Sequence, residues 1–422
     1  MSGNQRLKPL RLLSLFSGCG GMDLGFEGRF LVHEACIPNN IANDITLGKQ
    51  GSFYLLKPTR FQTVFANDIV VEAKKAWFMY FKERGHNPDL YHLDSIVDLV
   101  RKHRDGVSVF PQNIDIVTGG FPCQDFSLAG KRNGLQSHKD HKGQLKHIDT
   151  PSIETRGALY MWMKEVIEIT KPSVFIAENV KGLVNLANVK DIIQQDFSSI
   201  DGDGYHVFDP MVLQAADFGV PQSRERVFFI GLRKSVLQPP VRQQLLQDVL
   251  DENLLPYPKP THAYSTKNPD LEKPVCSGSV FQDLPEPENA GDPSQQYYSK
   301  AKYMGKHCQG QTEINAEGVA PTIRSEHHGN IEFRRLSSDH GGKYAEEMEK
   351  NNWKERRLTP RECALIQTFP PDFNFVIPSG KNRFFISTSA AYKMIGNAVP
   401  PLLAFHLARR IELLWDIYFP KS

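Results

Sequence analysis

The sequence has 422 residues, of which 40% are hydrophobic and 23% are charged. This length suits one large domain with a smaller second one, and the composition is that of an ordinary globular protein. The formal net charge of +2, from 50 basic and 48 acidic residues, argues against a uniformly basic nucleic-acid binder. Any surface that binds a polyanion must therefore gather its positive charge locally.

The six cysteines lie far apart and include no Cys-x-x-Cys pair. This spacing argues against a disulfide framework or a zinc knuckle and indicates a reducing compartment. No apolar run has membrane-spanning length, and the N-terminus lacks the apolar core of a leader peptide. We therefore expect a cytoplasmic protein with no bound metal and no membrane partner.

The first predicted strand, residues 11–16, leads through a glycine-rich turn at 17–21 into a helix. Glycines let a backbone approach a ligand, and a helix N-terminus presents free N–H groups. The turn matches neither the dinucleotide fingerprint nor the phosphate loop. It therefore favours a cofactor with a nucleoside and no tightly bound pyrophosphate, although many α/β proteins have a similar first turn.

Two aspartates follow the next predicted strands. Residues 33–60 are interpreted as an inserted surface excursion, after which the strand 63–66 ends before Asp68. A carboxylate at that place can accept both ribose hydroxyl protons, and the alternative is a helix cap. Asp94 lies just past residues 91–93, where it could receive an exocyclic amine or cap a helix.

Residues 115–124 contain a β-branched run, two glycines, and a cysteine directly after a proline. Such a pattern displays a thiol, here Cys123, at the end of a buried strand. A lone intracellular cysteine is more often a small buried hydrophobe, so other groups must support a reactive role. The segment 125–142 has the Gly, Lys and His content of a loop that closes over a phosphate-bearing partner.

A predicted helix over 157–170 is followed by the strand 174–177, which ends in Glu178. This carboxylate stands at the carboxyl end of its strand, as Cys123 does in the preceding strand–helix unit. Open α/β sheets form their sites at the carboxyl ends of strands. The alternative is a structural glutamate. Alternation at 222, 224 and 226 then predicts three long polar side chains on one face of a strand. That row could read a base edge or a phosphate, or serve solubility at an edge.

The composition changes over residues 235–355, which are rich in Pro, Gly, Ser and Gln and carry 13 Lys/Arg against 18 Asp/Glu. The net charge of 13 − 18 = −5 argues against a simple basic clamp. Basic and aromatic residues between 297 and 335, including Arg334 and Arg335, could still contact a backbone and bases. Regular structure returns at Thr359, a predicted N-cap, and a Gly-Asn turn at 396–397 precedes the last helix.

Together these stretches resemble the DNA (cytosine-5)-methyltransferase family of the prokaryotic restriction-modification type. Six motifs stand in the family's order and span nearly the whole chain except 33–60 and most of 235–355. They are Phe-Ser-Gly-Cys-Gly-Gly (16–21), Gly-Phe-Pro-Cys-Gln (120–124), Glu-Asn-Val (178–180), Gln-Ser-Arg-Glu-Arg (222–226), Arg-Glu-Cys-Ala (361–364) and Gly-Asn-Ala-Val (396–399).

The resemblance implies an α/β fold. We expect a Rossmann-like S-adenosylmethionine-dependent methyltransferase domain with a mostly parallel sheet, plus a smaller irregular target-recognition domain. The expected divisions are a catalytic domain at 1–234 with the 33–60 insertion, a target-recognition domain at 235–358, a hinge at 359–390, and a C-terminal segment at 391–422 that returns to the catalytic domain.

The resemblance also implies a mechanism. Cys123 would add to carbon 6 of a cytosine that has been flipped out of the duplex, and Glu178 would protonate or hydrogen-bond ring N3. Arg226 would reach the cytosine carbonyl, and Arg224 would support the catalytic loop. Carbon 5 then takes the methyl group from S-adenosylmethionine, which leaves S-adenosylhomocysteine, and no metal takes part.

Further roles are carried over by position. Phe16 should stack near the adenine, Asp68 should bind the ribose hydroxyls and Asp94 should meet the adenine amine. The expected cofactor residues are Phe16, Gly18, Gly20, Gly21, Asp68, Asp94, Pro122, Leu159, Asn397 and Val399. The expected DNA-binding residues are Gln124, Ser127, Lys131, Arg132, Thr322 and Arg324. Departures from the family pattern are Asp at 68, Ile at 323, the 33–60 insertion and a loop lengthened around 135–153.

The expected partner is double-stranded DNA, bound by a monomer associated with the nucleoid of a prokaryote or by a phage enzyme. A cognate restriction endonuclease would act on the same site without being bound. One alternative is a transfer-RNA cytosine-5 methyltransferase, against which the size of 235–355 and the Phe-Pro-Cys form speak. An inactive DNA-binding relative is disfavoured because Cys123, Glu178 and Arg226 are all present. A cysteine hydrolase would leave Glu178 and the glycine turn unexplained.

Overall fold

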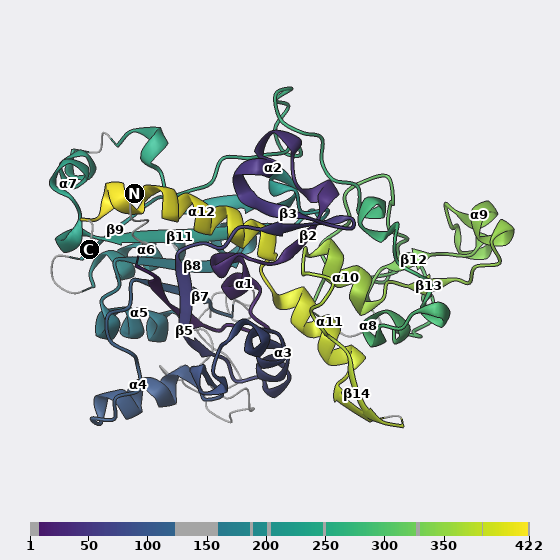
Figure 1. The fold of residues 1–422 in the computed structure, drawn as a ribbon, viewed down its shortest axis with the longest axis horizontal. Helices are drawn as coiled ribbons and strands as arrows, with labels where there is room; N and C mark the ends of the chain where they lie inside the picture. The colour runs from purple at the N-terminus through teal and green to yellow at the C-terminus, as the bar shows by residue number, and fades with distance from the viewer. Residues whose placement is uncertain are drawn as a thin grey trace, which may run out of the picture.

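The computed structural model describes residues 8–122, 159–185, 189–200, 204–247, 250–325, 330–381 and 383–420. Its centre is an eight-stranded sheet in the order β10-β11-β8-β7-β1-β5-β6, with β9 paired to β11 (Figure 1). The strands are β1 (Leu10–Leu15), β5 (Phe61–Asn67), β6 (Tyr91–His92), β7 (Ile116–Gly120), β8 (Val174–Val180), β9 (Tyr205–Val207), β10 (Met211–Gln214) and β11 (Glu225–Arg233).

The five strands from β6 to β8 are parallel, whereas β9, β10 and β8 each pair antiparallel with β11. The expectation of an α/β fold with a mostly parallel sheet is therefore confirmed. The register pairs Leu15 with both Asn67 and Gly119, and it pairs Gly120 with Glu178. Residues that follow β1, β5 and β7 consequently lie at one edge of the sheet, beside the end of β8.

Two apolar cores cover the two faces of this sheet. One contains buried residues of α1 (Gly21–Glu27), α3 (Val71–Phe81) and α12 (Pro401–Tyr418). The other contains buried residues of α4 (Ile96–Arg104), α5 (Leu159–Thr170) and α6 (Val189–Ser198). A Cβ on Gly25 of α1 would lie 2.4 Å from the Pro401 carbonyl oxygen, so the first and last helices pack backbone to backbone. The C-terminal helix therefore returns to the start of the chain.

Residues 31–56 form a small structure of their own. The strands are β2 (Leu31–His33), β3 (Thr46–Gln50) and β4 (Phe53–Leu56), and they form an antiparallel sheet in the order β2-β4-β3. The helix α2 (Asn39–Ile45) connects β2 to β3. Val32 and Leu56 are buried in the first core. The predicted surface insertion at 33–60 thus forms a small antiparallel sheet attached to the main body.

In the described part of residues 250–358 the α-helices and strands are short, and several 3-10 helices lie between them. The α-helices and strands are α8 (Pro293–Gln296), α9 (Ala345–Lys350), β12 (Phe333–Arg335) and β13 (Arg356–Arg357), with α7 (Pro239–Leu246) preceding them. Buried ion pairs hold this part together. Glu286 accepts from Arg335 at 3.0 and 2.5 Å and from Arg356 at 3.0 Å. Arg335 is 3% exposed, so the prediction that it could contact nucleic acid is wrong.

Two helices lead back to the sheet. Thr359 caps α10 (Pro360–Ile366), and its capping box with Glu362 confirms the predicted N-cap. A hairpin of β14 (Ile377–Gly380) and β15 (Arg383–Ile386) then precedes α11 (Thr388–Asn397). Figure 1 shows this hairpin projecting from the body of the molecule. Among the described residues, no helix combines the length and apolar character needed to cross a bilayer.

Candidate active site

A buried carboxyl group stands at the edge where the parallel strands end. Glu178 of β8 pairs in register with Gly120 of β7, and a Cβ on Gly120 would lie 2.7 Å from Glu178 Oε2. The glycine therefore leaves the space that the carboxyl group fills. Burial raises the pKa of Glu178, while the nearby Arg226 and Arg224 oppose that rise. The Arg226 Nε atom lies 2.9 Å from Glu178 Oε1, so the carboxyl group is held in one place.

The predicted nucleophile, Cys123, follows Gly120 by three residues and lies outside the described residues, as do Gln124, Ser127, Lys131 and Arg132. The chain that leads to it is fixed by Asn179, whose Nδ2 donates to the Phe121 carbonyl at 2.9 Å. Asn179 was not singled out from the sequence. Its role depends on the β7–β8 register, which a motif of three residues does not reveal.

The glycine turn after β1 is fastened to the end of β5. Gly18 N donates to Asp68 Oδ2 at 3.0 Å, and Val70 N donates to Asp68 Oδ1 at 3.0 Å. Tyr91 Oη donates to the Gly18 carbonyl at 2.9 Å. Asp68 therefore holds the glycine turn to the segment before α3. That helix has Val70 as its N-cap and no side-chain cap hydrogen bond, so the alternative interpretation of Asp68 as a helix cap is wrong. Each carboxylate oxygen accepts more than one hydrogen bond, so this arrangement leaves capacity for a ligand hydroxyl.

The three glycines of the turn have different surroundings. Gly18 has φ +55° and open space where a Cβ would stand. A Cβ on Gly20 would lie 2.6 Å from Trp77, and one on Gly21 would lie 2.4 Å from the Val399 carbonyl oxygen. Of the three, only Gly18 has the open surroundings that a ligand's approach requires. Gly20 and Gly21 allow the turn to pack against α3 and the 398–399 turn, and their contact with the cofactor stays a prediction.

A buried acid under the turn was missed by the sequence analysis. Asp23 of α1 accepts from Ser14 Oγ at 2.5 Å and from Trp77 Nε1 at 2.7 Å, and burial raises its pKa to about 6. Ser14 Oγ lies 2.9 Å from Ser17 Oγ, which accepts from Asn67 N at 3.1 Å. This chain of polar groups links the turn to β5. The only sequence signal was an acid in the first turn of a helix whose other residues, apart from Glu27, are glycines or apolar residues.

The remaining predicted cofactor residues are placed as follows. Phe16, with φ +54°, packs against the core that contains Leu159, and Leu159 is 5% exposed at the start of α5. Asp94 pairs with Lys102 at 3.1 Å. Pro122 is partly buried, Val399 is buried and Asn397 is exposed at the end of α11. Apart from Leu159, these residues lie close in sequence to the carboxyl ends of strands or to the 396–399 turn.

The predicted row of accessible polar side chains at 222, 224 and 226 is wrong. The strand β11 begins only at Glu225, and the side chains of Gln222 and Arg224 are buried. Gln222 bonds to Gln367 at 3.1 Å and to Ile323 N at 2.9 Å. Arg224 donates to the carbonyls of Ile323, Gly396 and Ala398 at 3.0, 2.7 and 2.9 Å. Arg224 therefore ties three segments together, and Arg226 alone of the row pairs with Glu178.

Replacing Arg224 by Met should lower the free energy of unfolding by roughly 3 kcal/mol or more, because three buried carbonyls lose their donor. Denaturant unfolding measures this change. Arg226→Met is the matched control, since Glu178 can take up a proton when its partner is lost. Arg226→Met should lose less stability than Arg224→Met but much more methyl-transfer activity. Equal stability losses in the two variants would contradict these roles.

The two predicted DNA-binding residues that the structure describes lie at one hollow. It has a volume of about 470 Å³ and is lined by Ser223, Tyr264, Glu313, Ile314, Asn315, Val319, Ala320, Pro321, Thr322, Arg324 and Lys343. Thr322 Oγ1 donates to the Ser223 carbonyl at 2.5 Å. The hollow thus lies where the 320–324 segment meets the turn before β11. Among the described residues, no group of three His, Cys, Asp or Glu side chains could hold a metal ion.

Comparison with known proteins identifies the family to which this chain belongs. The model of the C-5 cytosine-specific DNA methylase family matches residues 10–413. The chain is 32% identical to the type II methyltransferase M.BsuRI of Bacillus subtilis, over 99% of this chain and 82% of that protein. It is 28% identical to the type II methyltransferase M.NgoPII of Neisseria gonorrhoeae, over 96% of each chain. The chain belongs to the C-5 cytosine-specific DNA methylase family.

Solved structures agree in fold. A DNA modification methyltransferase encoded within an Escherichia coli prophage matches with a TM-score of 0.53 at 19% identity, over 96% of this chain and 99% of that one. The S. pombe Dnmt2 methyltransferase matches with a TM-score of 0.53 at 16% identity, over 97% of this chain and 99% of that one. At these identities the likeness concerns the fold alone.

Proposed function

We propose that the chain transfers a methyl group from S-adenosylmethionine to carbon 5 of a cytosine within a specific sequence of duplex DNA. The observation that supports this most strongly is the carboxyl group of Glu178. It is buried, its pKa is raised, and it lies beside Gly120, three residues before Cys123. Family membership supplies the substrate class, and the site supplies a proton donor for the ring.

The reaction needs a thiolate and an acid acting on opposite parts of one ring. Cys123 adds to carbon 6, and Glu178 gives its proton to ring N3, so that the electron pair from the ring reaches carbon 5. Arg226, whose Nε lies 2.9 Å from Glu178 Oε1, would donate to the cytosine carbonyl. The methyl donor supplies an electrophilic carbon. Loss of the carbon 5 proton to a base then expels the Cys123 thiolate, and ring N3 returns its proton to Glu178, which restores the neutral ring.

The glycine turn fits the nucleoside part of the methyl donor. Gly18 leaves open space above the turn, and the Asp68 carboxylate holds that turn while keeping acceptor capacity for ribose hydroxyls. Phe16 lies next to the turn, and Asp94 would give up part of its pairing with Lys102 to meet an adenine amine. Leu159, Pro122, Asn397 and Val399 complete the proposed pocket.

The proposed DNA contacts come from both sides of the target base. Extruding a base costs a few kcal/mol, which protein contacts must offset. Gln124, Ser127, Lys131 and Arg132 would act from the loop after Cys123, and Thr322 and Arg324 would act from the hollow beside Ser223. We retain the division into a catalytic domain (1–234), a recognition domain (235–358), a hinge (359–390) and a returning segment (391–422). We further propose that the chain acts as a monomer associated with the nucleoid, and that a restriction endonuclease recognises the same DNA sequence without binding to the chain.

The substrate is tested by incubating the purified chain with S-adenosylmethionine labelled in its methyl group. We expect label in duplex DNA as 5-methylcytosine, and bisulfite sequencing of DNA from expressing cells should place it at one short sequence. Transfer RNA in a parallel reaction should stay unlabelled. Label found only in RNA would overturn the proposal and favour the transfer-RNA enzyme.

A further inference from the structure

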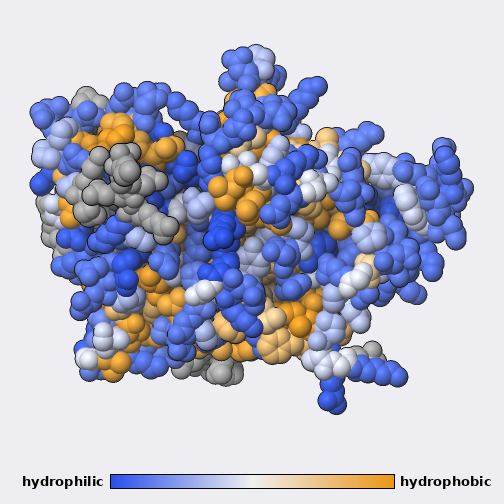
Figure 2. Space-filling model, in the orientation of Figure 1, coloured by the Kyte–Doolittle hydropathy of each residue, from blue (hydrophilic) through white to orange (hydrophobic). Residues whose placement is uncertain are grey.

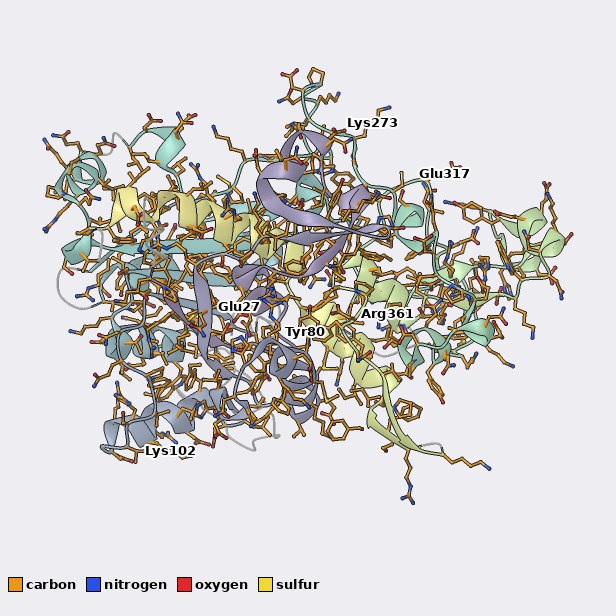
Figure 3. All side chains as sticks on the ribbon, in the orientation of Figure 1. Glu27, Tyr80, Lys102, Lys273, Glu317 and Arg361 are labelled. Carbon is orange, nitrogen blue, oxygen red and sulfur yellow. The ribbon has the colours of Figure 1, made fainter. Side chains whose placement is uncertain are left out.

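A basic hairpin projects from the chain between α10 and α11. It consists of β14 and β15, in which most side chains are partly or fully exposed, and it carries Lys381 and Arg383 on its outer end. Figure 2 shows a hydrophilic projection at this corner, and Figure 3 shows side chains there that end in nitrogen. The proposed reaction uses none of these residues.

The stretch of sequence that contains the hairpin carries charge of one sign. Residues 373–411 contain no Asp or Glu, in a chain that has 48 acids among its 422 residues. Within the described part of the chain, no ion pair joins Lys381, Arg383 or the neighbouring Lys75 to a carboxylate. Cations without acid partners keep their full attraction for a polyanion.

The hairpin touches both parts of the molecule. Lys75 of α3 lies 4.3 Å from the centre of the Phe385 ring and donates to the Phe385 carbonyl at 3.2 Å. On the other side, Phe384 packs edge to face with Tyr297, which follows α8, with ring centres 5.0 Å apart. The hairpin thus bridges α3, which packs on the central sheet, and the proposed recognition domain (235–358). Phe385 and Tyr297 remain 43% and 41% exposed.

We propose that this hairpin, with Lys381, Arg383 and Lys75, binds the phosphate backbone of duplex DNA outside the methylated sequence. The inference rests on the proposed function, because the DNA must already be held between the same two parts. A pair of exposed cations between exposed aromatic rings suits sugar and phosphate, which carry no sequence information. The hairpin should therefore add affinity and leave the choice of target unchanged.

The test measures binding of target duplexes whose flanks are lengthened in steps, at several salt concentrations. The wild-type chain should bind more tightly as the flanks grow, whereas Lys381→Ala/Arg383→Ala should lose most of that gain. Two lost phosphate contacts should reduce the slope of log affinity against log salt by about 2 and weaken binding roughly tenfold at low salt. Methylation of a short duplex at saturating concentration should stay at the wild-type rate.

The control removes two lysines elsewhere, Lys234 and Lys259. Lys234 begins a short 3-10 helix (Lys234–Val236) ahead of α7, and α7 lies at the opposite end of the view in Figure 1. Lys259 bonds to Asn253. Lys234→Ala/Lys259→Ala should keep the wild-type slope, and Lys381→Glu/Arg383→Glu should lose more affinity than the alanine pair. Wild-type slope and flank dependence in the hairpin variants would overturn the inference. Failure of the proposed function would look different, because the wild-type chain itself would not methylate the duplex.

Discussion

Cys123→Ser should abolish methyl transfer to DNA. A serine hydroxyl is far less acidic than a thiol, so at neutral pH it supplies almost no anion to add to carbon 6. The measurement is incorporation of labelled methyl groups, with DNA binding followed in parallel. Binding should persist, because the contacts proposed for the recognition region do not involve the thiol.

Cys308→Ser is the matched control. Cys308 is a partly exposed cysteine in the proposed recognition domain, and its Sγ donates to the Met304 carbonyl at 3.8 Å. This variant should transfer methyl groups at the wild-type rate. Appreciable transfer by the Cys123 variant, or loss of transfer in the Cys308 variant, would contradict the assigned nucleophile.

Glu178→Gln should lower kcat by roughly 10²–10⁴-fold, because the amide cannot donate a proton to ring N3. The wild-type rate should also fall as pH rises through the raised pKa of Glu178, since only the protonated carboxyl group can act as the acid. The variant has no such group and should lose that alkaline limb. Single-turnover rates across a pH series measure both effects.

Glu225→Gln serves as the control for this change. Glu225 begins β11 and pairs with Lys181 at 2.8 Å on the surface, one residue from Arg226. Its loss should alter neither the rate nor the pH profile. An unchanged alkaline limb in the Glu178 variant would show that another group supplies the proton.

The parallel sheet and its active edge could be predicted from the sequence. Apolar β-branched runs ended at Gly120 and at Glu178, and parallel strands bring their carboxyl ends to one side. The side on which a polar residue points was harder to predict. Alternation at 222–226 is equally compatible with an inward and an outward face, and Arg224 turned inward because three carbonyls require a donor there.

Roles that depend on contacts between distant segments could not be read from the sequence. Gly20 and Gly21 look alike in the motif, yet α3 determines the surroundings of one and the Val399 backbone those of the other. Asp23 and Asn179 act through hydrogen bonds to side chains and backbone groups of other segments, and the sequence does not show these contacts. Residues 33–60 hid an antiparallel sheet because β3, whose side chains after Thr46 are exposed, carries little apolar pattern.

Covalent addition through Cys123 is tested most directly with a target duplex that carries 5-fluorocytosine. Fluorine at carbon 5 cannot leave as a proton does, so the adduct that forms during turnover is trapped. In the presence of S-adenosylmethionine, we expect a stable protein–DNA complex whose cross-linked peptide contains Cys123. No complex under turnover conditions, or a cross-link to another residue, would contradict the mechanism.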